Sequence, residues 1–191
     1  MQEAQSRGKN KFIILALGDS LTAGYGLAPQ DSFASRLEQA LRQEDREVRV
    51  VNGGVSGDTA QDGLRRLKNL LRHEPDLVIV QFGANDMYMG LSAEEVRAGM
   101  EKIIDLCRER KALVLLAGII SLQTADDDYN QKFHRVFEEV AGNKDVPLLK
   151  DFMPGIPGNP EFTLADGIHP NEAGVDEMVK NILPLLRTML P

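Results

Sequence analysis

Short runs of apolar residues alternate with segments of helical periodicity along this chain, and no other feature constrains its fold as strongly. The first run, residues 12–17, is continuous and is followed by Gly18, which is typical of a strand buried on both faces of a parallel sheet. The five runs span residues 12–17, 48–51, 76–82, 113–117 and 146–149. This alternation predicts an α/β fold in which helices cover both faces of a five-stranded parallel sheet.

The intervening segments predict five helices. These helices are expected over residues 32–43, 59–72, 92–110, 127–141 and 172–190. Ser92 and Glu95 match a capping box at one helix start, and Asp58 and Thr59 provide N-cap chemistry at another. Pro184 predicts a kink or restart in the last helix, because proline lacks the N–H that a helix interior needs.

Composition limits the class of protein. The chain has 191 residues, of which 42% are hydrophobic and 27% are charged, as in a soluble globular protein. Because no linker, repeat or low-complexity tract divides it, one domain is expected over residues 1–191, with a polar N-terminal extension at residues 1–11. No stretch reaches the ~18 uncharged apolar residues of a membrane helix, so no transmembrane segment is expected.

Charge, cysteine content and the N-terminus narrow the partners and the compartment. The net charge of −7 argues against nucleic acid as a partner. Cys107 is the only cysteine, which excludes an intrachain disulfide and a cysteine-based zinc site and predicts a buried thiol. Residues 1–11 lack the apolar core of a signal peptide. Two expectations follow: a cytoplasmic protein, or an exported one whose signal was removed.

Chemically useful residues follow four of the predicted strands. In parallel sheets, ligands bind in the loops beyond the carboxyl ends of the strands. Those loops hold residues 18–21, 52–59, 83–86 and 166–170. Ser20 lies in the first of them, and its hydroxyl needs a base before it can act as a nucleophile.

His169 is the candidate base for Ser20. It follows the last strand and is expected at the same edge of the sheet, whereas His73 precedes a strand and His134 lies inside a predicted helix. Asp166 lies three residues before His169, so its carboxylate can return to the imidazole Nδ1 and fix the tautomer. The pattern predicts a catalytic triad of serine, histidine and aspartate.

Three hydrogen-bond donors are expected to stabilise the oxyanion that forms when Ser20 attacks a carbonyl. The first is the Ser20 backbone N–H, at the start of a strand-to-helix turn. Gly57 offers a second N–H that no side chain blocks, and Asn85 offers a side-chain amide. Loss of one such donor raises the barrier to formation of the tetrahedral intermediate by ~3–4 kcal/mol. Three donors beside a nucleophilic serine therefore predict acyl-transfer chemistry.

The motifs around these residues resemble those of the SGNH hydrolases, also called GDSL esterases. Four blocks read GDSLTAGYG at Ser20, NGGVSGDT at Gly57, GAND at Asn85 and DGIHP at Asp166 and His169. The resemblance covers residues 12 to 186, with particular likeness to bacterial multifunctional acyl-CoA thioesterases, arylesterases and lysophospholipases. It implies a flavodoxin-like three-layer α/β/α sandwich, an acyl-enzyme on the serine, and no metal or organic cofactor. Many members are exported to the periplasm, which favours the exported alternative here.

Two departures from the family pattern concern the substrate side. Ala84 replaces the second glycine of the usual GGND block and could shift the asparagine that follows it. Residues 118–129 lack the arginine and prolines that relatives carry after the fourth strand. Because that loop helps to form the acyl pocket in relatives, their chain-length preference does not transfer to this chain.

Apolar side chains in the loops suggest where an acyl group would bind. The candidate pocket residues are Met87, Tyr88, Ile120 and Leu122, and each CH₂ that they bury contributes ~0.8 kcal/mol. The expected partner is a small acyl ester or thioester, and the expected oligomeric state is a monomer or weak dimer. Carbohydrate O-deacetylation, which needs only a small acyl pocket, is the alternative among hydrolases.

A receiver-like signalling domain is the alternative from another class. It uses the same sheet, with acidic residues after the first and third strands and a lysine after the fifth. Asp19, Asp86 and Lys150 fit that pattern. This interpretation leaves the serine, glycine and histidine motifs without a role.

Overall fold

The structure is a computed structural model that describes residues 11–120, 122 and 126–191. Ten of the eleven residues of the predicted N-terminal extension lie outside the described residues, as do positions 121 and 123–125 of the unusual 118–129 segment. None of the helices in the described part of the chain has the length and apolar character needed to cross a membrane.

Five strands form one sheet in the order β2–β1–β3–β4–β5, and every neighbouring pair is parallel. The strands are β1 (Phe12–Gly18), β2 (Val48–Gly54), β3 (Leu77–Gln81), β4 (Leu113–Ala117) and β5 (Leu148–Leu149). This order brings the first strand to the interior of the sheet, beside the third. The predicted α/β fold with a five-stranded parallel sheet is confirmed.

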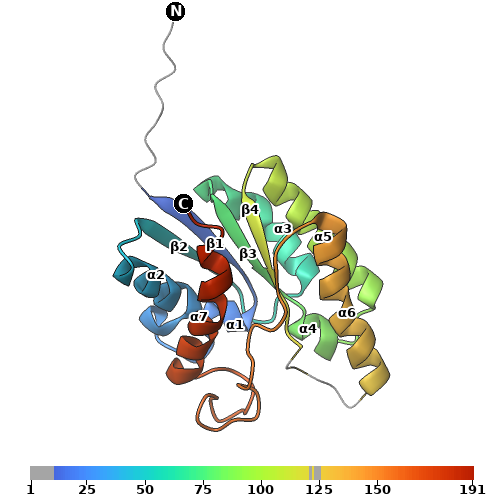
Figure 1. The fold of residues 1–191 in the computed structure, drawn as a ribbon. Helices are drawn as coiled ribbons and strands as arrows, with labels where there is room; N and C mark the ends of the chain where they lie inside the picture. The colour runs from blue at the N-terminus through green and yellow to red at the C-terminus, as the bar shows by residue number, and fades with distance from the viewer. Residues whose placement is uncertain (1–10, 121, 123–125) are drawn as a thin grey trace, which may run out of the picture.

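Helices cover both faces of the sheet, so that the fold has three layers (Figure 1). One layer contains α2 (Phe33–Gln43) and α7 (Glu172–Arg187), which pack against each other. The other contains α3 (Ala60–Leu70), α5 (Ala93–Glu109) and α6 (Asp127–Lys144), with α5 packed between its two neighbours. This is the flavodoxin-like sandwich that the resemblance implied.

The hydrophobic core lies on both sides of the two central strands. All five residues of β3 are buried, as are the last five of β1, which explains the continuous apolar runs at residues 12–17 and 77–80. Phe33 from one helix layer and Phe137 from the other are fully buried against the sheet. Cys107 of α5 is also buried, as predicted, and burial raises the pKa of its thiol to about 12.

The main difference from the predicted strands is β2, which continues through Gly53 and Gly54 instead of ending at residue 51. Gly54 pairs with Gly18, and a Cβ atom on Gly54 would lie 2.2 Å from the backbone nitrogen of Ala23. These glycines therefore allow close backbone approach rather than forming a turn. At the other edge of the sheet, β5 has only two residues, because only Leu148 and Leu149 pair with β4.

The helix ends follow the capping chemistry of the sequence. Ser92 and Glu95 form the predicted capping box of α5, and Thr59 forms a second one with Asp62 at the start of α3. The last helix continues through Pro184 without a restart. Four short elements were not predicted because they are too short to show periodicity: α1 (Ser20–Ala23), α4 (Ala84–Tyr88) and the 3₁₀ turns η1 (Pro29–Asp31) and η2 (Leu71–His73).

The carboxyl ends of the strands lie at the lower edge of the molecule in Figure 1, opposite the C-terminus. The short helix α1 follows β1 at this edge, and α4 follows β3. The long loop between β5 and α7, orange in Figure 1, descends to the same edge. Residues far apart in the sequence therefore meet there.

Candidate active site

Ser20 is the first residue of α1, directly after β1. The Asp19 carboxylate caps this helix by accepting the Leu21 backbone N–H at 2.9 Å. The cap holds the one-turn helix against the end of the strand and fixes the direction of the Ser20 side chain. Ser20 Oγ lies 2.9 Å from His169 Nε2, which is hydrogen-bond distance.

His169 is in turn held by Asp166. Its Nδ1 lies 2.6 Å from Asp166 Oδ2, while Asp166 Oδ1 accepts the backbone N–H groups of Ile168 and His169, each at 2.9 Å. Burial alone would raise the pKa of the Asp166 carboxyl, but these hydrogen bonds outweigh it and lower the pKa below its ordinary value. The carboxylate is therefore ionised and orients the imidazole.

The other two histidines lie away from this cluster. His73 ends the 3₁₀ turn η2 and is exposed. His134 lies on α6, and its Nε2 is 3.1 Å from the Leu122 carbonyl oxygen. The structure thus brings only one of the three histidines to Ser20, as the order of elements predicted.

The Tyr25 ring also contacts the His169 imidazole, and the sequence did not predict this contact. The two ring centroids lie 4.4 Å apart, with the ring planes inclined by 37°. Tyr25 follows α1 and belongs to the same sequence block as Ser20. That proximity to the serine was the only signal in the sequence that could have pointed to it.

The Gly57 turn lies beside the end of β1. The Asp58 N–H donates to the Val55 carbonyl at 3.2 Å and closes a four-residue turn with Gly57 in its third position. Gly57 has φ of +88°, a conformation that favours glycine, and a Cβ there would meet no atom within 4 Å. The backbone favours glycine at this position because of its conformation, not because a side chain would lack room.

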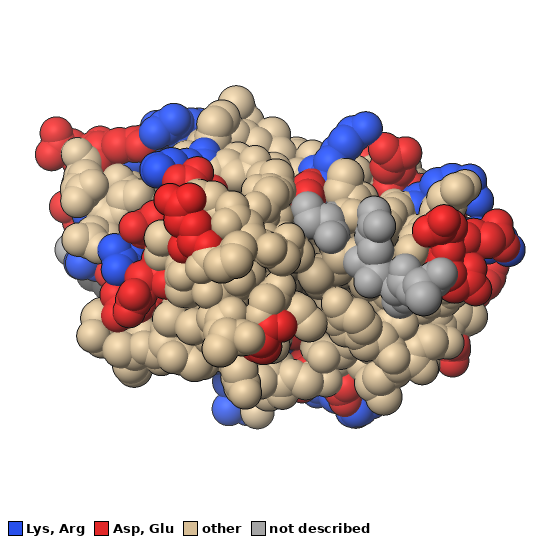
Figure 2. Space-filling view, turned by 90° about the horizontal axis from the view of Figure 1, so that it is seen from below, with Lys and Arg blue, Asp and Glu red and all other residues tan. Residues whose placement is uncertain are grey.

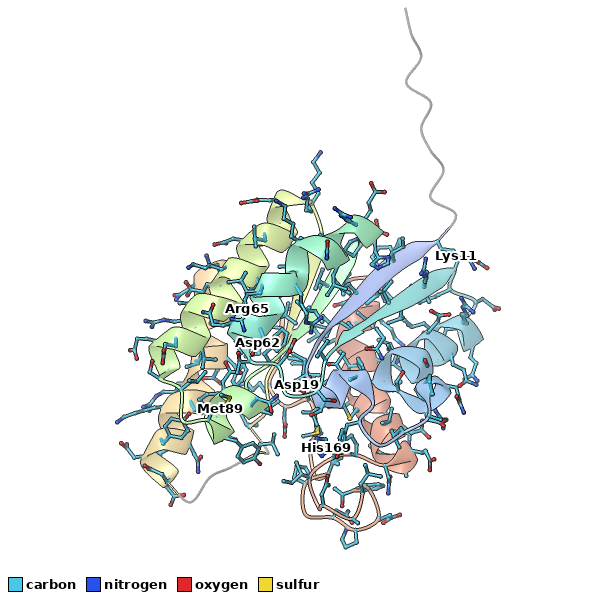
Figure 3. The ribbon with its side chains drawn as sticks, turned by 180° about the vertical axis from the view of Figure 1, so that it is seen from behind. Lys11, Asp19, Asp62, Arg65, Met89 and His169 are labelled. Atoms are coloured by element: carbon cyan, nitrogen blue, oxygen red, sulfur yellow. The ribbon has the colours of Figure 1, made fainter. Side chains whose placement is uncertain are left out.

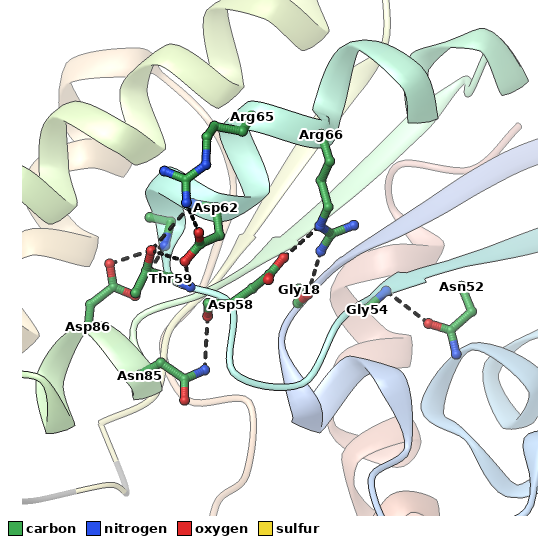
Figure 4. Close-up of polar contacts among 11 residues, drawn as sticks. Gly18, Asn52, Gly54, Asp58, Thr59, Asp62, Arg65, Arg66, Asn85 and Asp86 are labelled. Atoms are coloured by element: carbon green, nitrogen blue, oxygen red, sulfur yellow. Dashed lines mark hydrogen bonds and ion pairs between the residues drawn. The ribbon is translucent and has the colours of Figure 1, made fainter.

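Asn85 comes from α4 and reaches the same loop (Figure 4). Its Nδ2 donates to the Asp58 carbonyl at 2.9 Å. A side-chain amide nitrogen carries two hydrogens, so this bond leaves one hydrogen to donate elsewhere. The structure therefore assembles all three predicted donor residues, Ser20, Gly57 and Asn85, at one edge of the sheet.

Alanine at position 84, where the family pattern has glycine, does not displace Asn85 from its contact with Asp58. Ala84 is the first residue of α4, and the left-handed backbone conformation falls on Gly83, with φ of +120°. Since Ala84 itself lies outside the positive-φ region, its methyl group causes no backbone strain. The Asn85 amide still reaches Asp58.

Two buried carboxylates, those of Asp86 and Asp19, accept backbone N–H groups from the segments around the site. Asp86 accepts the Ala60 N–H at the start of α3, at 3.1 and 3.2 Å from its two oxygens, and burial raises its pKa. Asp19 is fully buried, and desolvation raises its pKa to about 7 against hydrogen bonds from Leu21 and Gln81 that lower it. Both carboxylates bind neighbouring loops and helix starts.

The receiver-like alternative is not supported by these contacts. Its lysine, Lys150, pairs with Glu138 on α6 at 2.9 Å. Its acidic residues, Asp19 and Asp86, bind backbone N–H groups of α1 and α3. Among the described residues, no three histidine, cysteine, aspartate or glutamate side chains gather as a metal site.

The four candidate pocket residues divide into two pairs. Tyr88 and Ile120 are exposed, whereas Met87 and Leu122 are buried in the hydrophobic core and line no open surface. Met87 lies on the inner side of α4, an orientation that the sequence could not show because α4 itself was not predicted. Ile120 borders a cavity of about 120 Å³ with Phe137 of α6.

Uncharged side chains cover most of the face at the carboxyl ends of the strands. Figure 2 views the molecule from this side, and its lysines and arginines lie toward the periphery. Figure 3 shows Asp19, His169 and Met89 at the same end of the molecule. Besides Ile120, four large apolar residues in α4 and the loops after β1, β2 and β3 are exposed, namely Tyr25, Val55, Tyr88 and Met89.

A parallel α/β sandwich with serine, histidine and aspartate hydrogen-bonded in sequence at its carboxyl edge defines a class of hydrolases that act on acyl groups. The sequence matches the GDSL-like lipase/acylhydrolase family over residues 16–176. The chain belongs to this family.

Similar proteins carry the names of ester and thioester hydrolases. An arylesterase of Vibrio mimicus is 35% identical over 168 residues, which cover 87% of this chain and 83% of the relative. Thioesterase 1/protease 1/lysophospholipase L1 of Escherichia coli is 34% identical, over 91% of this chain and 84% of the relative. The crystal structure of TesA superposes with a TM-score of 0.87 at 32% identity, over 93% of this chain and 99% of TesA. This chain is therefore a hydrolase that acts on ester or thioester bonds.

Proposed function

We propose that the protein hydrolyses acyl esters through an acyl-enzyme on Ser20. The observation that carries the proposal is the chain of contacts from Ser20 Oγ to His169 Nε2 at 2.9 Å and from His169 Nδ1 to Asp166 Oδ2 at 2.6 Å. In this arrangement the imidazole nitrogen that faces the serine is the acceptor, because the other nitrogen donates to the carboxylate.

The first half of the reaction forms the acyl-enzyme. His169 takes the proton from Ser20 Oγ as the oxygen attacks the acyl carbonyl carbon. The carbonyl π electrons move to its oxygen, which becomes the oxyanion of a tetrahedral intermediate. When the bond to the leaving group breaks, His169 gives its proton to the departing alcohol or thiol.

Water completes the reaction by the same steps. His169 removes a proton from water, the resulting hydroxide adds to the acyl carbon, and the bond to Ser20 Oγ breaks. The proton returns from His169 to the serine oxygen, and the carboxylic acid leaves. Asp166 stabilises the imidazolium at each stage and remains ionised.

Three donors stabilise the oxyanion in this proposal. The Ser20 N–H belongs to the first residue of α1 and so has no partner within that helix. The Gly57 N–H and the second amide hydrogen of Asn85 come from the neighbouring loops. This part of the proposal is supported by the hydrogen bonds that bring the Gly57 turn to the end of β1 and Asn85 to that turn.

The preferred substrate in this proposal is an ester with an apolar acyl chain and an uncharged leaving group. The exposed side chains of Val55, Tyr88 and Met89 supply apolar surface beside the site. The lysines and arginines lie toward the periphery of this face (Figure 2), so little positive charge is available there for the phosphates of an acyl-CoA.

A series of esters tests both parts of the proposal. Rates of hydrolysis are measured with p-nitrophenyl acetate, octanoate and palmitate and with octanoyl-CoA, on the parent protein and on Ser20→Ala. We expect kcat/KM to be highest for octanoate or palmitate, lower for octanoyl-CoA, and absent in the variant. A preference for acetate would favour carbohydrate O-deacetylation, and parental activity of Ser20→Ala would refute the acyl-enzyme.

Location and oligomeric state stay predictions. Export after signal removal is tested by fractionating cells that express the full gene, where activity in the periplasmic fraction supports it and activity in the cytoplasmic fraction contradicts it.

A monomer or weak dimer is tested by light scattering over a range of protein concentrations. A stable higher oligomer would contradict that prediction.

A further inference from the structure

The ion pair between Asp58 and Arg66 joins two segments of the site. Asp58 directly follows Gly57, and its Oδ2 lies 2.6 Å from Arg66 Nε on α3. A second guanidinium nitrogen of Arg66 donates to the Gly18 carbonyl at 2.9 Å. One guanidinium thus binds both the turn that carries Gly57 and the strand end two residues before Ser20 (Figure 4).

Both ends of the Gly57 turn are connected to the Gly18 carbonyl, one directly and the other through Arg66. At its start, the Val55 N–H donates to the Gly18 carbonyl at 3.0 Å. At its end, the Asp58 carboxylate reaches that carbonyl through Arg66. The turn, the guanidinium and the end of β1 therefore form a closed ring of hydrogen bonds.

The third donor residue is attached to this ring as well. Asn85 Nδ2 donates to the backbone carbonyl of Asp58, the residue whose carboxylate binds Arg66. A shift of Asp58 would therefore move the Gly57 N–H, which precedes it, and the Asn85 amide, which is bonded to it. Ser20 is coupled to both through Gly18.

Burial distinguishes this pair from the more exposed ion pair between Arg65 and Asp62. The side chains of Asp58 and Arg66 are 15% and 23% exposed. Arg65, the preceding residue of α3, is 72% exposed and pairs with Asp62 of its own helix. A pair that is partly desolvated and bonded at two points holds its geometry more firmly than an exposed pair.

We infer that Asp58 and Arg66 are positioning residues that hold the three oxyanion donors in one arrangement. This inference rests on the proposed roles of Ser20, Gly57 and Asn85. Donors stabilise a transition state only when they are oriented before the charge develops, and a displacement of about 1 Å can cost ~100-fold in rate. Arginine suits the task because its planar fork binds the carboxylate and the carbonyl at once, whereas a lysine ammonium is a single point of charge.

Kinetics of Arg66→Ala, with Arg65→Ala as the matched control, test the inference. We expect kcat of Arg66→Ala to fall about 10- to 100-fold, with KM changed less than about twofold, because the donors act on the transition state. Inhibition by an alkyl trifluoromethyl ketone, which forms an oxyanion on the serine, should weaken in parallel. Arg65→Ala should keep parental values in both measurements, because it only removes an exposed pair.

A second variant covers the case in which Arg66→Ala does not fold. Arg66→Lys keeps the charge but loses the second bond, so a smaller fall in kcat is expected at a temperature well below its Tm. Parental kcat in a folded Arg66→Ala or in Arg66→Lys would overturn the inference, as would a loss confined to KM. These outcomes leave the proposed function standing if Ser20→Ala is inactive, so the two failures are distinguishable.

Discussion

His169 Nε2 and Ser20 Oγ lie 2.9 Å apart, although 149 positions separate the two residues in the sequence. The contact exists because β1 lies in the interior of the sheet, so that the loop after its carboxyl end adjoins the long loop that precedes α7. The parallel sheet thus supplies the nucleophile at the start of the chain and the base near its end.

Replacing Asp166 by Asn tests the orientation of His169. The remaining oxygen can still accept the Ile168 and His169 backbone N–H groups, so the turn should keep its shape. The new NH₂ group faces Nδ1 and favours the tautomer with its proton on the wrong nitrogen. We expect kcat to fall by about 10²- to 10⁴-fold in steady-state ester hydrolysis, with an unchanged circular dichroism spectrum. Activity within tenfold of the parent would contradict the role of this carboxylate.

Replacing Asn85 by Ala tests the side-chain donor of the oxyanion hole. We expect kcat to fall by about 10²- to 10³-fold, while KM changes little. Asn52→Ala is the matched control, because Asn52 also bonds a backbone carbonyl at this edge, that of Ala23, at 3.2 Å. Equal losses in the two variants would mean that Asn85 only bridges loops.

Replacing Gly57 by Ala tests the backbone donor. A methyl group meets no neighbouring atom, so the effect comes from the φ of +88°, which costs about 1–2 kcal/mol for a residue with a Cβ. Gly155 has φ of +71° and equally open surroundings, so Gly155→Ala carries a comparable strain. Both variants should lose a similar amount of stability in urea unfolding, but only Gly57→Ala should lose kcat. A comparable kcat in both would argue against a Gly57 donor.

Asp19 should make stability depend on pH. Its pKa is about 7 in the folded state against an ordinary value of 3.8, so the folded state retains a proton that the unfolded state releases. The free energy of unfolding therefore falls as pH rises from about 4 to about 7 and then levels off. Tm is measured across this range for the parent and for Asp19→Asn, which cannot ionise. The Tm of the parent should fall more than that of Asp19→Asn between pH 4 and about pH 7. Parallel curves of Tm against pH would disprove the raised pKa of Asp19.

Much of the fold was predictable from the sequence because buried parallel strands have a distinctive pattern. Residues 12–17 of β1 and 77–80 of β3 are continuous apolar runs because helices cover both faces of these strands. The capping residues of α5 were predictable for a local reason, since the side chains of Ser92 and Glu95, three residues apart, form the capping box with each other. The extension of β2 was not predictable, because Gly54 owes its place to the Ala23 backbone of a distant segment.

The site likewise has parts that the order of elements predicts and parts that depend on contacts between distant segments. Ser20 and His169 could be brought together from the order of strands alone, because that order decides which loops share an edge. The Arg66 contacts with Asp58 and Gly18, and the Tyr25 contact with His169, depend on side-chain directions across elements. No spacing rule in a single sequence reports those directions.

Covalent labelling of Ser20 tests the central claim most directly. The parent protein is treated with a fluorophosphonate, and its mass and the labelled peptide are determined by mass spectrometry. We predict one label per chain, located on Ser20, with loss of ester hydrolysis in proportion to labelling and no label on Ser20→Ala. A label on another residue, or full hydrolytic activity in a protein labelled at Ser20, would contradict the account.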